Sequence, residues 1–257
     1  MSSTATAARR ASIVDLATST GLASVEELSA QFGVTSSTIR RDLAKLTAEG
    51  RVARTYGGAM AMHSRPESSL PQRSGEAHEA KAGIAAWAAA RVHAGDTVLL
   101  DAGSTVGALA IALQPITELT VATVSLTAIA ALSDAPGVTV ECLGGRLRPL
   151  SQGFFGPLAE TALERMTFDA VFLGTDGVST DGAICEADLQ QTRLKEIMVR
   201  RSETVYVLAH GAKIGIKPFH AWLQLQRPWT LVTDASAPVE HLDQLRLLGV
   251  DVVVVDA

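Results

Sequence analysis

Several features that are scarce or missing narrow what this 257-residue chain can be. Its only cysteines, Cys142 and Cys185, cannot build a disulfide framework or a cysteine-only metal site, and the six histidines show no ligand-like spacing around them. We therefore expect no metal and no cofactor. Aromatic residues make up only 4% of the chain, which argues against the stacking platforms that bind single-stranded nucleic acid.

Long apolar runs are also missing. No stretch reaches the roughly 18 apolar residues of a membrane span, and the first ten residues lack the apolar run of a secretory signal. We therefore expect a cytoplasmic protein with no membrane partner. The chain does contain 47% hydrophobic residues over a length that suits two modest domains or one large one, which excludes a disordered tail protein.

Positive charge is local rather than general. The net charge is −5, so the surface as a whole is not positively charged, yet the stretch up to Met62 carries a net charge of +2. Most of its basic residues fall between Arg40 and Arg54, as the short positive stripe of a phosphate-binding surface requires. Residues 63–77, rich in Ser and Pro with little apolar content, are predicted to be a linker.

Three short helices are predicted in the N-terminal sixty residues. The first spans about residues 8–18. Ser24 precedes a second helix, in which Glu27 completes a capping box, and Gly33 ends that helix. Thr35 is the candidate N-cap of the third helix.

The third helix combines a buried stripe with a basic face. Ile39, Leu43 and Leu46 repeat at i, i+4 and i+7. Two short helices joined this closely have the dimensions of a helix-turn-helix, whose second helix offers its outer N-terminal face to the major groove. An arginine fork can donate two hydrogen bonds to guanine, and hydroxyls at a helix start can contact bases or phosphates. The predicted DNA-binding residues of this helix are Thr35, Ser36, Ser37, Thr38, Arg40, Arg41 and Lys45.

The stretch behind this helix predicts a small β-wing. Residues 51–60 alternate like a strand and turn at a Gly-Gly pair, and Arg51 and Arg54 would contact the phosphate backbone. A basic pair on a helix is usually only a solvated face, but here the spacing, cap, stripe and wing agree with one another. Asp42 lies beside the buried stripe and is expected to pair with an arginine of the same chain, because phosphates would repel it.

From Glu79 onward, helical stretches alternate with short β-branched runs, which indicates an α/β domain that begins with a long helix over residues 79–93. Ligands of such sheets lie beyond the carboxyl ends of the strands, where this chain places small polar residues. The expected strands are Thr97–Leu100, Leu119–Thr123, Val138–Cys142, Ala170–Leu173, Thr204–Leu208, Thr230–Thr233 and Val250–Val255.

The first three strand ends carry hydroxyls and cations. Residues 101–105 (DAGST) join a strand to a helix, where backbone N–H groups and hydroxyls can surround a phosphate, although Ser and Thr there can equally be helix caps. Thr123 and Ser125 offer two further hydroxyls. Residues 144–148 (GGRLR) form a flexible loop whose arginines suit phosphate or carboxylate, or are simply surface charges.

The later strand ends carry carboxylates and lysines. Asp176 can accept protons from sugar hydroxyls or stabilise a turn. Glu186 precedes a helix that bears Lys195, and Lys213 follows the next strand. A lone lysine is usually a solvated charge, so only the gathering of several strand ends makes these two lysines candidates for ligand binding.

Three motifs follow one another in the N-terminal part: residues 35–43 (TSSTIRRDL), then Glu49-Gly50, then residues 56–59 (YGGA). Together they closely resemble the DNA-binding signature of the DeoR family of bacterial transcriptional regulators. In that family a winged helix-turn-helix precedes a sugar-phosphate-sensing α/β domain similar in fold to ribose-5-phosphate isomerase and glucosamine-6-phosphate deaminase. The resemblance implies a winged helix-turn-helix over residues 5–62, a linker over 63–77 and an effector domain over 78–257.

The resemblance also implies a function. The chain is expected to be a transcriptional regulator, a repressor of a carbohydrate catabolic operon, that a phosphorylated sugar or related metabolite releases from double-stranded operator DNA. One short helix contacts few base pairs, so we expect a homo-oligomer. By analogy, the first four of the effector-binding residues hold the phosphate, and Asp176 and the two lysines approach the sugar. The implied residues are Asp101, Gly103, Ser104, Thr105, Thr123, Ser125, Gly145, Arg148, Asp176, Lys195 and Lys213.

Two departures from the family pattern leave the effector open. The family commonly has Asn where Val124 stands and Asp-Ser-Ser where residues 210–212 (HGA) stand, so His210 either reads the charge of a different effector or is a loop residue. The alternative function is a sugar-phosphate isomerase or deaminase-like enzyme with an accessory DNA-binding domain, which would need a base near Asp176 and Lys195. Because an enzyme has no use for a DNA-binding unit, we expect a regulator without enzyme activity.

Overall fold

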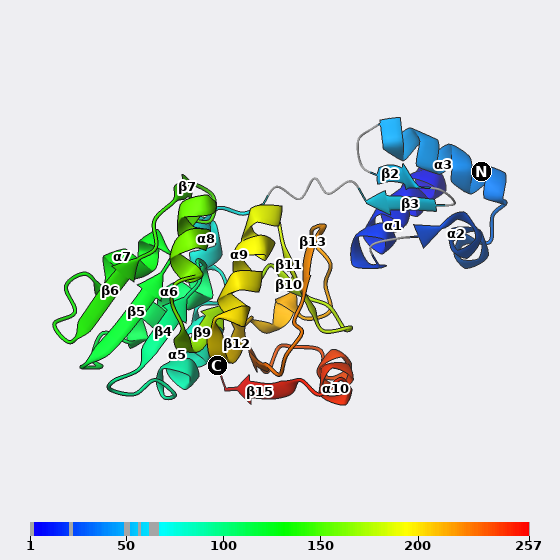
Figure 1. The fold of residues 1–257 in the computed structure, drawn as a ribbon. Helices are drawn as coiled ribbons and strands as arrows, with labels where there is room; N and C mark the ends of the chain where they lie inside the picture. The colour runs from blue at the N-terminus through cyan, green and yellow to red at the C-terminus, as the bar shows by residue number, and fades with distance from the viewer. Residues whose placement is uncertain (1–2, 21–22, 49–51, 56–57, 62–66, 257) are drawn as a thin grey trace. The chain divides into compact units, whose positions relative to one another are not determined.

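A computed structural model of the chain describes residues 3–20, 23–48, 52–55, 58–61 and 67–256 (Figure 1). The chain divides into two compact units. The first comprises the N-terminal part up to residue 66, and the second comprises residues 67–257 apart from 216–219. Within the described ranges, no helix is long and apolar enough to cross a membrane.

The N-terminal unit packs three helices against a small antiparallel sheet, whose strand order is β1-β3-β2. Its core consists of Ile13, Val25, Leu28, Ile39, Leu43 and Leu46. Its elements are α1 (Ser3–Thr20), β1 (Ala23–Ser24), α2 (Val25–Phe32), α3 (Ser36–Ala48), β2 (Val52–Thr55) and β3 (Gly58–Ala61).

Local sequence signals set the ends of these helices. The Ser24 hydroxyl accepts the Glu27 N–H at 3.1 Å while Glu27 accepts the Ser24 N–H at 3.0 Å, so the predicted capping box is confirmed. Gly33 ends α2 in the left-handed region, at φ 59°. Helix α1 is longer than the predicted 8–18, because its flanking Ser, Thr and Ala residues include no Gly or Pro that would stop it.

The second unit is built on a parallel seven-stranded sheet of order β15-β14-β12-β9-β4-β5-β6. A small antiparallel sheet (β10-β11-β13) and a β7–β8 hairpin flank it. The elements are α4 (Leu70–Gly75), α5 (His78–Ala89), β4 (Thr97–Leu100), α6 (Ser104–Ala112), β5 (Leu119–Thr123), α7 (Leu126–Leu132), β6 (Val138–Cys142), β7 (Arg146–Arg148), β8 (Gly153–Phe155), α8 (Pro157–Leu163), β9 (Phe168–Leu173), β10 (Gly177–Val178), β11 (Ala183–Glu186), α9 (Leu189–Arg200), β12 (Ser202–Leu208), a 3₁₀ turn (Gly211–Lys213), β13 (Ala221–Gln224), β14 (Thr230–Asp234), α10 (Val239–Leu247) and β15 (Asp251–Val255).

Helices cover both faces of the large sheet. Alternate residues of a strand point to opposite faces, so Leu99 of β4 packs into a core with α8, α9 and α10, whereas Val98 and Leu100 pack into a core with α5, α6 and α7. The near-continuous apolar runs of the central strands follow from this burial on both sides.

The strand order reverses between β4 and β9, which are hydrogen-bonded neighbours. From β4 the chain moves through β5 to β6, and from β9 it moves the other way through β12, β14 and β15. In open α/β sheets, such a reversal leaves a crevice at the carboxyl ends of the two strands. The loops that leave β4 at Asp101 and β9 at Gly174 therefore define where a ligand site is expected.

All seven predicted strands belong to this sheet, with ends that differ by at most two residues. The long helix expected over residues 79–93 ends earlier, at Ala89 in α5. The predicted linker over 63–77 is wrong from Glu67 onward: Ser69 and Gln72 form a capping box for α4, and Leu70 is buried. Residues 63–66 lie outside the described residues.

Candidate functional site

Helix α3 presents a basic face opposite its buried stripe. Arg40, Arg41 and Lys45 are exposed, and among the described residues none of them has a hydrogen-bond or ion-pair partner. Ile39 and Leu43, by contrast, are almost fully buried. The structure therefore separates the side chains that hold the helix from the cations that remain available to a polyanion.

Asp42, the acidic residue of α3, does not reduce this available charge. Its side chain is 3% exposed and accepts hydrogen bonds from Arg9 Nε at 2.8 Å and from Arg10 Nε at 2.7 Å. The prediction of an internal arginine partner is confirmed. Because the Asp42 carboxylate is paired with two arginines of α1, it does not neutralise the arginines and the lysine on the outer face of α3.

Hydroxyls surround the start of α3. Thr35 Oγ1 accepts the Thr38 N–H at 3.3 Å and lies 2.9 Å from the Ser37 hydroxyl, while Ser36 Oγ accepts a hydrogen bond from Ser29. Thr35 and Ser37 are exposed and Ser36 and Thr38 partly so. The predicted hairpin behind α3 is present as β2 and β3, but Arg51 lies outside the described residues and the structure describes only the backbone of Arg54.

A small polar cavity lies in the second unit where the strand order reverses. It brings together six of the predicted effector residues, Gly103, Ser104, Thr105, Asp176, Lys195 and Lys213. Its full lining is Arg73, Ala102, Gly103, Ser104, Thr105, Gly174, Thr175, Asp176, Glu186, Gln191, Lys195 and Lys213.

The floor of the cavity is a buried ion cluster around Lys195. Its ammonium lies 3.0 Å from Asp101 Oδ2, contacts Glu186 Oε1, and donates to the Gly174 carbonyl at 2.6 Å. Burial alone would lower the pKa of Lys195, but the Asp101 and Glu186 carboxylates outweigh it and raise that pKa above its ordinary value. Lys195 is therefore charged and occupied by the protein itself.

This cluster changes the role of Asp101. The predicted phosphate contact does not fit, because Asp101 is 1% exposed, is paired with Lys195, and accepts the Gly174 N–H at 3.1 Å. It ties the loop after β4 to the loop after β9. A carboxylate there would repel a phosphate rather than bind it.

The rim of the cavity carries polar atoms that lack partners. Arg73 Nη1 lies 3.3 Å from Asp176 Oδ1, which is long for a charge-assisted hydrogen bond. Asp176 Oδ2, Arg73 Nε and Gln191 Oε1 are all buried and have no partner among the described residues. A buried polar atom without a partner costs free energy, so these three atoms point to a ligand or waters that would supply the missing hydrogen bonds.

Four predicted effector residues have structural partners and do not line the cavity. Thr123 Oγ1 donates to the Leu100 carbonyl at 2.9 Å, and Ser125 caps α7. Gly145 packs against the backbone of Phe155 with φ +113°, a conformation that favours glycine. Arg148 pairs with Glu67.

Among the lining residues outside the predicted set, Arg73 and Gln191 are the two that carry partnerless buried polar atoms. Arg73 falls in the stretch that was predicted to be a linker, although the Ser69…Gln72 spacing with Pro71 was a signal for a helix start. Gln191 follows the N-cap Asp188 of α9 and donates to Glu186 Oε2 at 3.0 Å. No local pattern marks it as a cavity residue.

His210 is uncharged near neutral pH. Burial, followed by repulsion from Lys213 and Lys81, lowers its pKa to about 4. Its Nδ1 is buried without a partner in the part of the chain that the structure describes, so a neutral hydrogen bond is still open to it.

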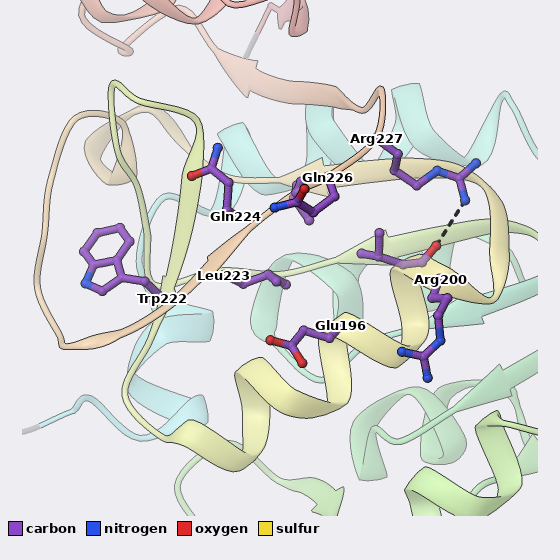
Figure 2. A pocket seen from close by; sticks show the side chains of 9 residues that line it. Glu196, Arg200, Trp222, Leu223, Gln224, Gln226 and Arg227 are labelled. Carbon is purple, nitrogen blue, oxygen red and sulfur yellow. Dashed lines mark hydrogen bonds between the residues drawn. The ribbon is translucent and has the colours of Figure 1, made fainter.

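A larger cavity, of about 690 Å³, lies between α9 and β13 (Figure 2). Arg227 there donates to the Val199 carbonyl at 3.2 Å, and Arg200 pairs with Glu164 at 3.4 Å. None of the partnerless buried polar atoms in the described residues belongs to it. Size favours this cavity, but the smaller one has the chemistry of a ligand site, and we place the candidate site there.

Comparisons with known proteins match both units of the chain to the same family. Residues 9–65 match the DeoR-like helix-turn-helix domain, and residues 76–235 match the DeoR C-terminal sensor domain. The chain is 32% identical over 255 residues to a putative aga operon transcriptional repressor of Escherichia coli O157:H7, which covers 98% of this chain and 95% of the relative. It is 28% identical to the glycerol-3-phosphate regulon repressor of E. coli K12, over 92% and 94% of the two chains.

A further relative is the uncharacterized regulator YulB of Bacillus subtilis, at 35% identity over 90% of this chain and 89% of the relative. Among solved structures, a ribose 5-phosphate isomerase from Methanocaldococcus jannaschii is similar with a TM-score of 0.39 and 16% identity, over 53% and 54% of the two chains. With both DeoR-family domains matched in this chain, and with a relative 32% identical over 98% of it, the chain belongs to the DeoR family of DNA-binding transcriptional regulators.

Proposed function

We propose that this regulator represses a carbohydrate catabolic operon and that a phosphorylated sugar or a related polyol phosphate releases it from operator DNA. The names of its relatives, which include repressors of aga and glycerol-3-phosphate regulons, support the class of operon. The observation that carries the class of effector is the set of partnerless buried polar atoms, Asp176 Oδ2, Arg73 Nε and Gln191 Oε1, gathered in one cavity.

The two kinds of group in this cavity suit the two ends of a sugar phosphate. Gly103 gives α6 no side-chain cap, so the first N–H groups of α6, with the hydroxyls of Ser104 and Thr105, are available to a dianion. Asp176 and Gln191 each offer a free acceptor oxygen, which matches the donors of sugar hydroxyls.

Lys213 supplies further positive charge on the cavity wall. Its ammonium donates to the Thr175 carbonyl and has no ion pair among the described residues. Burial is the main cause that lowers its pKa. An anionic ligand would stabilise the charged form of Lys213 and gain affinity from it.

For the DNA side, we propose that Arg40 and Arg41 read bases in the major groove while the hydroxyls at the start of α3 and Lys45 contact phosphates. Arg51 and Arg54 are proposed to contact the DNA backbone from the hairpin. Since one α3 reads few base pairs, the protein is proposed to bind paired half-sites as a homo-oligomer.

The effector proposal is tested by calorimetry with matched ligand pairs: glucose 6-phosphate against glucose, and glycerol 3-phosphate against glycerol. We expect a phosphorylated member to bind and to release operator DNA, and the Ser104→Ala/Thr105→Ala variant to lose both responses while keeping operator affinity. Ser133→Ala, at the exposed end of α7, is the control. Equal binding of phosphorylated and unphosphorylated ligands, or an unaffected double variant, would contradict the proposal.

One observation favours the alternative of an isomerase or deaminase-like enzyme. Burial raises the pKa of Glu186 above its ordinary value, which is the direction that general acid–base chemistry at a carboxyl group uses. However, its Oε1 is held by Lys195 and its Oε2 by Gln191, so neither oxygen is free to take a substrate proton. Turnover of ribose 5-phosphate or glucosamine 6-phosphate by the purified protein would favour the enzyme.

A further inference from the structure

The segment with which the second unit begins also lines the cavity of that unit. Residues 67–75, called here the α4 segment, follow the DNA-binding unit in sequence and end in α4. Leu70 is 2% exposed, and its N–H donates to the Leu150 carbonyl at 2.8 Å. From this segment Arg73 reaches the cavity wall. One short stretch therefore joins the DNA-binding unit to the proposed effector site.

Two ion pairs fasten the α4 segment to the second unit. Glu67 is held by Arg148, with a hydrogen bond of 2.7 Å, and Arg73 faces Asp176 at 3.3 Å. The two pairs are neighbours, because Arg73 Nη2 also lies 3.9 Å from Glu67 Oε1. All four side chains are mostly buried, so salt screens these pairs less than it screens surface pairs. Breaking either pair leaves a poorly solvated charge, which favours a discrete change of partner over gradual loosening.

The Arg73–Asp176 ion pair is weaker than the Glu67–Arg148 pair, and it is the one that a ligand in the cavity would contact. Its separation is longer than that of a good charge-assisted bond, and both side chains keep a partnerless buried atom, Arg73 Nε and Asp176 Oδ2. An anionic ligand group would compete with Asp176 for the guanidinium, while a ligand hydroxyl would satisfy Asp176.

We propose that Arg73 couples the effector site to DNA binding: in the empty protein it holds the α4 segment on Asp176, and a phosphorylated ligand takes it from Asp176 and frees the segment. The pair between Glu67 and Arg148 belongs to the empty, DNA-binding arrangement. This inference rests on the proposed function and adds its mode of regulation. A ligand shifts such an equilibrium only by its differential affinity for the two arrangements, and exchange of the Arg73 partner supplies that difference.

Thermodynamic reciprocity makes the proposal testable with Glu67→Gln, which changes the fastening outside the cavity lining. If the variant weakens the empty arrangement, operator affinity must fall and affinity for the phosphorylated probe must rise. A folding defect would lower both affinities. Arg200→Gln, which removes an ion pair with Glu164 elsewhere in the same unit, is the matched control and should change neither.

The experiment measures operator affinity of the full-length variants by fluorescence anisotropy, alone and with saturating glucose 6-phosphate or glycerol 3-phosphate, and probe affinity by calorimetry. We expect Glu67→Gln to shift the two affinities in opposite directions. For each protein, the operator Kd with probe is divided by the operator Kd without probe. This ratio should be at least about fivefold lower for Arg73→Gln than for the wild type, even when calorimetry shows that the probe is bound. Unchanged affinities in Glu67→Gln, a fall in both, or an unchanged ratio in Arg73→Gln would overturn the proposal.

The effector class and the coupling can fail separately. If neither phosphorylated probe binds the wild type, the proposed effector class is wrong. Weaker operator binding by Glu67→Gln than by Arg200→Gln in the absence of any probe, at an unchanged midpoint of urea unfolding, would still support the coupling, and equal binding by the two would overturn it.

Discussion

The cations on the outer face of α3 and the buried lysine of the cavity lie in opposite surroundings. On α3, Arg40 and Arg41 are exposed and have no partner among the described residues, whereas Lys195 in the cavity is 2% exposed and lies between two carboxylates. Water stabilises the exposed charges at little cost, so they remain available to a polymer that arrives with its own phosphates. The charge of Lys195 is buried and paired with Asp101 and Glu186, so it holds the fold rather than the ligand.

The largest test of this contrast removes the buried cation. Lys195→Met should leave Asp101 and Glu186 buried without a counter-ion and lower the free energy of unfolding by about 3–5 kcal/mol. Urea titration followed by circular dichroism measures the loss. The matched control is Lys45→Met on the exposed face of α3, which should stay within about 0.5 kcal/mol of the wild type. Similar losses for the two lysines would contradict the contrast.

Removal of an exposed cation should instead affect binding. Arg40→Ala or Arg41→Ala should weaken specific operator binding by about 1–3 kcal/mol if that arginine contacts a base in bidentate fashion. Stability should stay unchanged, because both side chains lie off the buried stripe of α3. Anisotropy titrations against specific and unrelated DNA separate base reading from general attraction. The assignment of α3 as the reading helix fails if both variants bind operator like the wild type.

Lys81, a buried lysine whose ammonium donates to the backbone carbonyls of Arg73 and Glu76, gives a pH-dependent intermediate case. Burial, then repulsion from Lys213, lowers the pKa of Lys81 from 10.5 to about 8. Between pH 8 and pH 10.5 the unfolded chain holds this proton more often than the folded protein does, so Lys81 makes stability rise with pH in that window. The slope from one group is at most about 1.4 kcal/mol per pH unit.

Urea titrations of wild type and Lys81→Met at pH 8 and pH 10 measure this contribution. The difference in stability between the two proteins should shift in favour of the wild type as the pH rises. A difference that is the same at both pH values would show that Lys81 titrates normally in the fold.

The smallest effect concerns a cap that involves no buried charge. Ser24→Ala removes one half of the capping box of α2 and should cost about 1 kcal/mol. Thermal unfolding of the variant measures the change, with the exposed Ser37→Ala as a control for loss of a hydroxyl. A cost as large as that of Lys195→Met would mean that local caps, and not buried pairs, dominate stability.

The N-terminal unit was largely predictable because its signals are local. The Ser24–Glu27 box, Gly33 and the Ile39–Leu43–Leu46 stripe lie within one turn or one helix of the groups that they organise. The strands of the large sheet were predictable for a similar reason. Burial on both faces leaves a near-continuous apolar run in central strands such as β4 and β9, and β-branched residues mark the more exposed edge strands β6 and β15.

The cavity was predictable only in part. Sequence placed Ser104, Asp176 and Lys213 at strand ends, but it could not show which strand ends meet, because that depends on the sheet order. It also could not show that Asp101 forms an ion pair with Lys195, or that Arg73 lines the cavity from a stretch whose composition is typical of a linker. These contacts join residues that are far apart in the chain, so no local sequence pattern predicts them.

The pairing of β4 with β9 and of β9 with β12 has a consequence for how the protein is made. During synthesis the core residues of the DNA-binding unit, from Ile13 to Leu46, leave the ribosome before any strand of the large sheet. The cavity must wait for β12 and for Lys213 beyond it. Translation that stops early would therefore release a DNA-binding unit that no metabolite controls, so complete synthesis is itself a condition for regulation.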